Sequence, residues 1–178
     1  MRNTDGSAWE CCPREFLRRG VLALDEASGL ELVAAFEPEF VHTGIEDRPG
    51  HAYSLNAFRR QGIFGESLIA ALRAAGLTPD SFLTEYGPRQ FEVTVAPEKA
   101  LRAADAAVIA REMARGAAFR LGNRAMFSPM PVADGVGNGV HIHFSLHDST
   151  GAPVTYAAAG PLGLSEPAAQ FAAGVLHH

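Results

Sequence analysis

Three segments of the chain alternate hydrophobic and polar side chains. They are residues 31–42, 90–95 and 140–146. A period of two is typical of a strand that has one face in water and one in a core. The sequence therefore predicts three one-faced strands, with a loop between residues 42 and 53.

Other segments repeat their apolar residues at a spacing near 3.6. Residues 65–75 and the alanine-rich residues 98–121 show this period, which predicts two helices. A short helix is expected over residues 14–19, where Gly20 would end it, and a last one from about Ser165 to the C-terminus. Helices separate the strands, but the strands are one-faced. This favours an α+β fold with an antiparallel sheet over a doubly wound parallel one.

Composition narrows the class of protein. The chain has 178 residues, 47% of them hydrophobic and 20% charged, which suits one globular domain rather than a disordered chain. A net charge of −5 gives no electrostatic reason to expect a nucleic-acid partner. No apolar run is long enough to cross a membrane, and no secretion signal is recognisable. The two cysteines, Cys11 and Cys12, are adjacent and too few for a disulfide scaffold, so a cytoplasmic setting is expected.

Acidic side chains gather on the polar faces of the predicted strands. Glu37 and Glu39 are two residues apart, so in a strand they share a face with Cα atoms roughly 7 Å apart. Glu92 lies on the polar face of its own strand, and Glu85 comes seven residues earlier, across a turn. Such a pattern is common on solvated faces, so each pair alone has a plain structural explanation.

The third strand adds histidines to this set. His141, His143 and Ser145 share one face of residues 140–146. Four carboxylates and an imidazole suit Mg²⁺ or Mn²⁺ better than a structural zinc ion. An alternative is a cupin, because Gly135 and the two histidines fit the opening of its motif. The glutamate that should follow is missing, and a long helix does not suit a small barrel.

Ordered segments of the chain resemble the glutamine synthetase family. The resemblance rests on residues 36–40 (Phe-Glu-Pro-Glu-Phe), 85–92 (Glu-Tyr-Gly-Pro-Arg-Gln-Phe-Glu) and 138–146 (Asn-Gly-Val-His-Ile-His-Phe-Ser-Leu). Weaker matches at residues 5–14, 125–131 and 165–177 extend it over nearly the whole chain. The variants of these segments are similar to those of the γ-glutamyl-polyamine and γ-glutamyl-amine ligase branch.

The resemblance implies a partial catalytic domain over residues 1–178, with a curved antiparallel sheet flanked by helices. The N-terminal β-grasp domain and the later half of the catalytic domain would be absent. It implies an ATP-dependent ligase that joins glutamate to ammonia or an amine through γ-glutamyl phosphate, in a homo-oligomer. A non-catalytic homologue that binds metal or nucleotide, or mediates assembly, is the alternative. The present chain alone is expected to be inactive.

The resemblance also implies roles for individual residues. Two ions, Mg²⁺ or Mn²⁺, would bind, the first at Glu39, Glu85 and Glu92 and the second at Glu37 and His141. His143 and Ser145 would contact the nucleotide, and Gly137 the glutamate. The chain departs from the family where Arg89 replaces a usual glycine and Val136 replaces a frequent asparagine.

Overall fold

The computed structural model describes residues 1–44 and 52–178. Residues 45–51, in the loop expected between 42 and 53, lie outside this described part. The helices are α1 (Pro13–Ser28), α2 (Leu55–Arg59), α3 (Gly62–Ala74), α4 (Ala100–Arg120), the short 3-10 helix η1 (Pro161–Gly163) and α5 (Glu166–His177). The strands are β1 (Glu31–Thr43), β2 (Pro79–Thr84), β3 (Gln90–Val95), β4 (Glu98–Lys99), β5 (Arg124–Met126) and β6 (Val140–His147).

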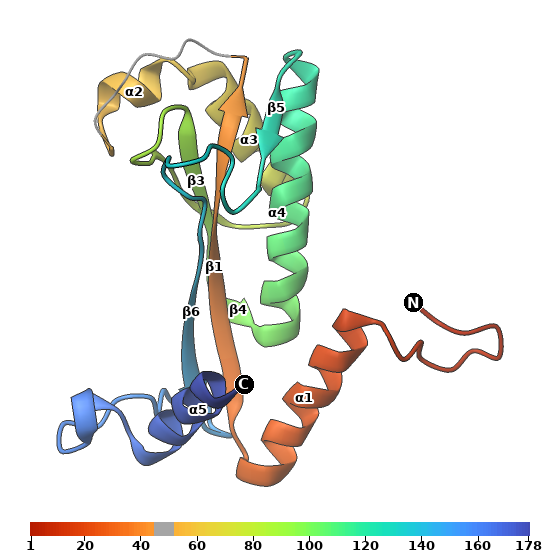
Figure 1. The fold of residues 1–178 in the computed structure, drawn as a ribbon. Helices are drawn as coiled ribbons and strands as arrows, with labels where there is room; N and C mark the ends of the chain where they lie inside the picture. Colours follow the sequence, from red (N-terminus) through yellow and green to blue (C-terminus); the bar gives the residue numbers. More distant parts are fainter. Residues whose placement is uncertain (45–51) are drawn as a thin grey trace. The chain divides into compact units, whose positions relative to one another are not determined.

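The strands of the described residues form one six-stranded sheet around β1 (Figure 1). The path is β2-β3-β1-β4, and β5 and β6 also pair with β1. The β1–β3, β1–β4, β1–β5 and β2–β3 pairs are antiparallel. This confirms the α+β fold class. An open sheet flanked by helices also differs from the closed barrel that the cupin alternative requires.

The prediction that Gly20 ends the first helix is wrong. α1 continues through Gly20 to Ser28 and ends at Gly29, which has φ 67° and donates its N–H to the Asp25 carbonyl at 2.7 Å. An internal glycine costs a helix about 1 kcal/mol, which does not suffice to stop it. The left-handed conformation at Gly29 is what terminates the helix.

Short elements escaped prediction because they carry little periodicity of their own. β2, β4, β5 and α2 are all absent from the predicted set. The helix expected from Glu98 begins at Ala100, because Glu98 and Lys99 pair with Ala34 and Val33 of β1 instead. Pairing with a partner strand overrides the local preference of these two residues.

The chain divides into two compact units. The site unit comprises Ala35–Pro97 and Ala104–Ile142, and the terminal unit comprises Met1–Ala34, Glu98–Ala103 and His143–His178.

In the site unit, the apolar face of the sheet packs against α3 and α4. Phe40 of β1 pairs with Phe91 of β3 and contacts Phe64 of α3 edge-to-face, with ring centroids 5.9 Å apart. Small residues of α4, among them Ala110 and Ala114, join the same buried cluster. Since residues alternate between faces along a strand, burying this face directs the neighbouring polar residues to the other one.

In the terminal unit, Leu146 of β6 and Ala168 of α5 are buried, and the rings of Phe144 and Phe171 lie 5.0 Å apart. Ser165 caps α5 by accepting a hydrogen bond from the Ala168 N–H.

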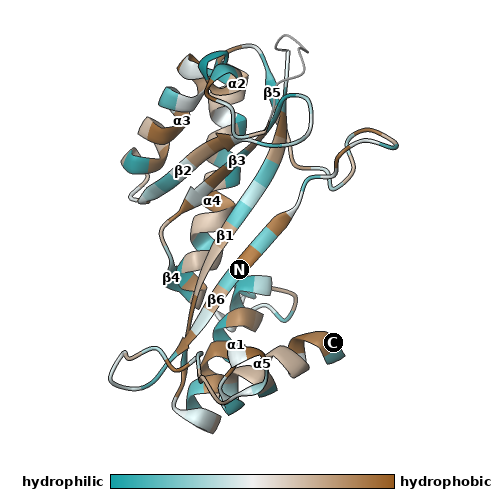
Figure 2. Ribbon diagram, turned by 90° about the vertical axis from the view of Figure 1, so that its left-hand side faces the viewer, coloured by the Kyte–Doolittle hydropathy of each residue, from teal (hydrophilic) through white to brown (hydrophobic). Residues whose placement is uncertain are grey.

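Figure 2 shows hydrophilic and hydrophobic residues alternating along β6. The prediction that its apolar face lies in a core is wrong for most of the strand, because Val140, Ile142 and Phe144 are exposed and only Leu146 is buried. Within the described part of the chain, no helix is sufficiently long and apolar to cross a membrane.

Candidate metal site

Strand register brings the acidic residues of β1 and β3 together. Glu39 lies directly opposite Glu92 in the antiparallel β1–β3 pair. Side chains opposite each other have Cβ atoms roughly 5 Å apart. Glu37 and Glu39 both line one pocket of the site unit, which confirms that they share a face of β1.

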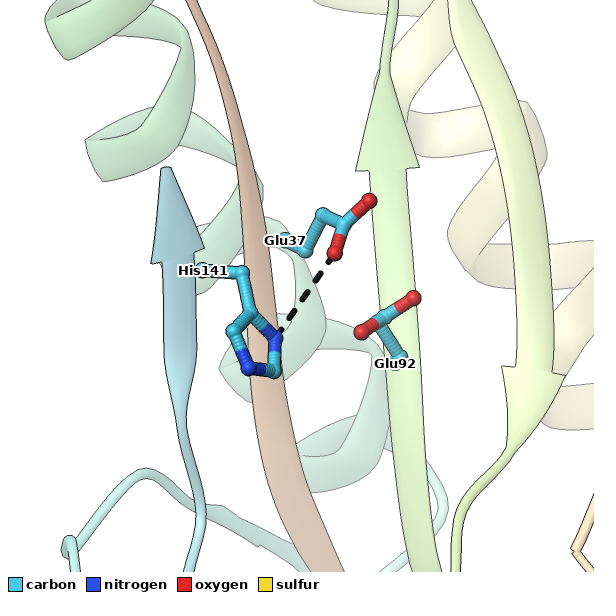
Figure 3. Close-up of side chains that lie close together, drawn as sticks. All are labelled: Glu37, Glu92 and His141. Atoms are coloured by element: carbon cyan, nitrogen blue, oxygen red, sulfur yellow. Dashed lines mark ion pairs between the residues drawn. The ribbon is translucent and has the colours of Figure 1, made fainter. Parts of the chain in front are cut away.

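Glu37, Glu92 and His141 form a cluster that can hold a metal ion (Figure 3). One potential ligand atom from each lies within 4.8 Å of the others. His141 Nδ1 is 3.7 Å from Glu37 Oε2 and also 3.7 Å from Glu39 Oε1. Three strands, β1, β3 and β6, therefore converge their polar faces on one point.

The pocket around this cluster measures about 580 Å³. Glu85, which follows β2 directly, also faces it, and the Tyr53 hydroxyl lies 3.5 Å from Glu85 Oε2. The pocket is lined by Glu37, Glu39, Tyr53, Glu85, Tyr86, Gln90, Glu92, Val136, Gly137, Asn138, Gly139 and His141.

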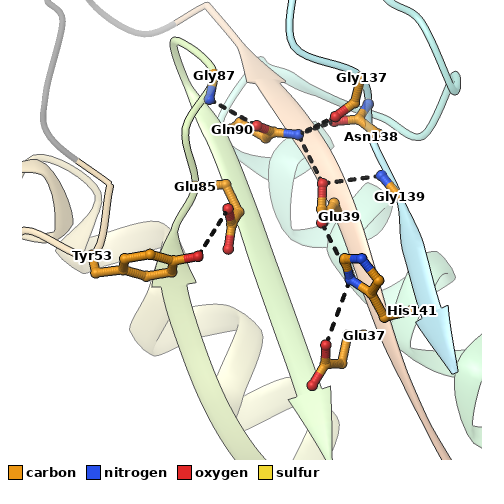
Figure 4. Close-up of polar contacts among 10 residues, drawn as sticks. All are labelled: Glu37, Glu39, Tyr53, Glu85, Gly87, Gln90, Gly137, Asn138, Gly139 and His141. Carbon is orange, nitrogen blue, oxygen red and sulfur yellow. Dashed lines mark hydrogen bonds and ion pairs between the residues drawn. The ribbon is translucent and has the colours of Figure 1, made fainter. Parts of the chain in front are cut away.

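The Gln90 side chain holds the wall of the pocket in place (Figure 4). Gln90 is 2% exposed. Its amide nitrogen lies within hydrogen-bond distance of Glu39 Oε2 (2.9 Å) and the Gly137 carbonyl (2.8 Å), while its oxygen accepts from the Gly87 N–H at 2.8 Å. The Gly139 N–H donates to the same Glu39 oxygen at 3.0 Å. One carboxylate oxygen of Glu39 is thus fixed, and the other remains directed towards His141.

Burial and mutual repulsion make two carboxylates of this pocket, Glu92 and Glu85, hard to ionise. Glu92 is 7% exposed. Burial, followed by the charges of Glu37, Glu85 and Glu39, raises the Glu92 pKa from the ordinary 4.5 to about 7. Burial and the Glu39 charge also raise the pKa of Glu85. A bound cation would relieve this repulsion, and oxygen-rich ligands with one imidazole are those that Mg²⁺ and Mn²⁺ accept. The donor set therefore fits a hard divalent cation.

Two turns of the site depend on unusual backbone geometry. Gly137 lies so close to the backbone of Pro129 that an added Cβ would be 2.9 Å from the Pro129 carbonyl oxygen. Arg89, where the resembled family usually has glycine, has φ 58°, a left-handed conformation that glycine adopts at least cost. The turn between Glu85 and Glu92 thus keeps a glycine-like backbone despite the substitution.

The structure brings most of the predicted site residues into one place. Glu37, Glu39, Glu85, Glu92, His141 and Gly137 all line the pocket of the site unit. His143 and Ser145 belong to the terminal unit and do not line this pocket. The Ser145 hydroxyl there lies 2.9 Å from His147 Nε2.

Sequence reasoning missed three residues of the site. The sequence could have indicated Gln90 as a site residue, because it lies two residues before Glu92 and therefore on the same face of β3. Asn138, whose side-chain amide donates to the Ser128 carbonyl at 2.9 Å, follows Gly137 directly. Tyr53 reaches Glu85 only through the fold, and its spacing in the sequence gives no hint of this contact.

Comparison with known proteins connects this geometry to one family. The family model for the glutamine synthetase catalytic domain matches residues 10–178. The chain is 34% identical to a γ-glutamylpolyamine synthetase of Streptomyces coelicolor over 98% of its own length and 39% of that protein's. A crystal structure of a novel glutamine synthase homolog is 46% identical, with TM-score 0.92, over 99% of this chain and 42% of that one. The structure of GmaS in complex with ADP is 29% identical, with TM-score 0.85, over 98% and 42%. The chain thus spans about two fifths of the length of these relatives.

Proposed function

The chain belongs to the glutamine synthetase family, and from this premise we propose that it supplies the metal-binding part of an ATP-dependent ligase. The ligase would join the side-chain carboxylate of glutamate to ammonia or an amine. The single observation that carries this proposal is the convergence of Glu37, Glu92 and His141 within 4.8 Å, beside a further two buried or partly buried carboxylates. Carboxylates in such a cluster can hold divalent cations, and phosphoryl transfer needs cations to neutralise the charge of the phosphate groups.

Divalent cations, when bound, would neutralise phosphate oxygens and orient the attacking carboxylate. The residues of this chain would do the holding. Following the resemblance, Glu39, Glu85 and Glu92 would bind one ion, and Glu37 and His141 the other. The observed cluster suggests a second grouping, because Glu92 lies with Glu37 and His141. Gln90 supports either arrangement by fixing one oxygen of Glu39.

Substrates would surround the ions. The Gly137 backbone would contact glutamate, and its closeness to the Pro129 carbonyl fits a position where a side chain is excluded. His143 and Ser145 would contact ATP, a proposal supported by the ADP bound to the relative GmaS. The relative named γ-glutamylpolyamine synthetase supports an amine as acceptor. Assembly into a homo-oligomer and a cytoplasmic location remain predictions of the same proposal.

Manganese binding to this chain tests the ligand assignment directly. We expect isothermal titration calorimetry to show Mn²⁺ binding that Glu92→Gln weakens at least tenfold, because losing a ligand should cost at least as much affinity as losing a residue that only supports one, which is roughly tenfold to hundredfold. Glu98→Gln, an exposed glutamate of β4, is the matched control and should leave binding unchanged. If Glu85→Gln weakens only one of two binding events and Glu92→Gln weakens both, Glu92 contacts both ions. Unchanged binding in Glu92→Gln would refute its role as a ligand.

Turnover requires a separate assay on a polypeptide that contains this chain and the remaining catalytic region of the family. We expect ADP release from Mg²⁺-ATP and glutamate that depends on added ammonia or on one of a panel of amines. The amine that gives the highest kcat/KM identifies the acceptor. Retained Mn²⁺ binding without ADP release from any acceptor would favour the alternative, a homologue that binds metal without catalysis.

A further inference from the structure

Helix α1 has a side that the terminal unit leaves exposed. Leu17, Val21 and Leu24 recur at helical spacing and are half-buried, so they form the side that packs on the rest of this unit. Phe16 lies on the neighbouring side and is 73% exposed. Among the residues that the structure describes, α1 contributes no buried side chain. A helix covered to this small extent leaves apolar surface open to a partner.

The exposed side of α1 carries a regular apolar row, which we call the α1 seam. It consists of four exposed residues at steps of four, three and four: Phe16, Gly20, Ala23 and Ala27. These steps keep the residues on one side of a helix, and they are the steps at which two helices pack lengthwise. Because three of the four side chains are small, a partner helix can approach to about 8 Å between the axes.

The charges of α1 are segregated along its length. Residues 13–20 contain three arginines and one glutamate, whereas residues 21–28 contain Asp25 and Glu26 and no basic residue. The glutamate of the first half, Glu15, forms an ion pair with Arg18. Arg19 and Glu26 are exposed, and each comes one residue before a member of the α1 seam. They are seven residues apart, so they flank the seam on the same side, one near each end.

An antiparallel pair of α1 helices matches both the seam and the charges. If a two-fold axis passes beside the middle of the seam, Phe16 of one copy faces Ala27 of the other, so a large side chain meets a small one. Arg19 then lies beside Glu26 of the other copy, and the two-fold axis repeats this contact. A parallel pair would place Arg19 beside Arg19 and Glu26 beside Glu26. The charges therefore select the antiparallel arrangement, in which the two helix dipoles also oppose each other.

We propose that the α1 seam pairs two copies of this chain through antiparallel α1 helices. A second copy is the occupant because the face is complementary to itself in size and in charge, which is what a two-fold interface requires. The 16-residue helix is about 24 Å long. Two helices of this length bury less than the roughly 1,600 Å² of a standard interface, so the pairing is weak and reversible. The proposal concerns the terminal unit and does not depend on the proposed ligase activity.

Analytical ultracentrifugation of the whole chain tests the pairing. We expect a reversible monomer–dimer equilibrium within a range of about 5–500 µM, as suits a small interface. EDTA excludes association through metal at the carboxylate pocket, and a reducing agent excludes a disulfide between exposed Cys11 residues. A chain that stays monomeric throughout this range would overturn the proposal.

Charge reversal tests the position and the direction of the pairing. Arg19→Glu and Glu26→Arg each bring like charges together at both symmetric contacts, so each should raise the dimer dissociation constant at least tenfold. The double variant Arg19→Glu/Glu26→Arg restores opposite charges and should return the constant to about the wild-type value. Arg73→Glu, which reverses an exposed arginine of α3, is the matched control and should leave it unchanged. A double variant as weak as the single ones would refute the antiparallel register.

Replacement of the exposed phenylalanine tests the seam itself. Phe16→Gln should also raise the dissociation constant at least tenfold, because the Phe16 ring is the largest apolar group of the seam. Phe119→Gln, at an 80% exposed phenylalanine of α4, is the control. All these side chains are exposed, so far-ultraviolet circular dichroism should show an unchanged fold. A dimer that persists in Phe16→Gln and in both charge variants, or that Phe119→Gln alone abolishes, would place the pairing on another face and refute the proposal.

Discussion

Replacement of Glu92 by glutamine changes one atom type in the pocket and removes one buried charge. Glu92 is 7% exposed, and its pKa is raised to about 7 by burial and by the charges of Glu37, Glu85 and Glu39. In the unfolded chain the same carboxyl has an ordinary pKa near 4.5. Without metal, the folded protein therefore holds a proton on Glu92 over a pH range in which the unfolded chain has lost it.

The sign of the pH effect follows from this difference. A raised carboxyl pKa favours the folded state at low pH, and this contribution is lost as pH rises from 4.5 through about 7. Integrated between pH 5 and pH 8, the loss in the free energy of unfolding is about 2–3 kcal/mol. Glutamine cannot ionise, so the variant should lack this loss and be more stable than the wild type at pH 8.

Urea unfolding at pH 5 and pH 8 with EDTA measures the effect. We expect the stability difference between Glu92→Gln and wild type to grow by about 2–3 kcal/mol in favour of the variant over this range. Glu98→Gln, an exposed glutamate of β4, is the control and should show no such change. Saturating Mn²⁺ should reverse the order, because only the wild type has the full ligand set. If the free energies of unfolding of wild type and Glu92→Gln changed equally between pH 5 and pH 8, the conclusion that burial and repulsion raise the Glu92 pKa would be refuted.

Two further positions give separate tests. Gly20→Ala should raise the free energy of unfolding by about 0.5–1 kcal/mol, because the helix continues through this residue and a Cβ would meet nothing within 4 Å; a urea midpoint below that of the wild type would contradict this. Gly137→Ala, in contrast, should lower stability by about 1–3 kcal/mol and weaken Mn²⁺ binding, because its Cβ would press on the Pro129 carbonyl. Gln90→Met should cost about 1–3 kcal/mol in the same urea assay, because the buried Glu39 carboxylate loses its amide donor; unchanged stability would show that Gln90 is not needed there.

The sequence determined the elements that have a strong period and the side chains that share a face, but it did not determine how far each face is buried. β3 was predicted to have one face in water and is buried on both faces, whereas the apolar face of β6 is largely exposed. Alternation along β1 placed Glu37 and Glu39 together, because a strand has a period of two whatever its partners. The prediction from the sequence failed at Gly20, because the pattern alone does not distinguish a glycine that weakens a helix from one that ends it. It also failed at β2 and β4, which form because a partner strand offers backbone hydrogen bonds.

Only the tertiary structure decided which side chains meet. The sequence indicated Glu92 and His141 as candidate ligands, but their closeness to Glu37 depends on strand register, which no local pattern contains. The contacts of Gln90 with Glu39 and Gly137 join residues about fifty positions apart. Local chemistry specifies what each strand offers to a site, whereas the pairing of distant strands, driven by burial of their apolar faces, specifies what the site contains.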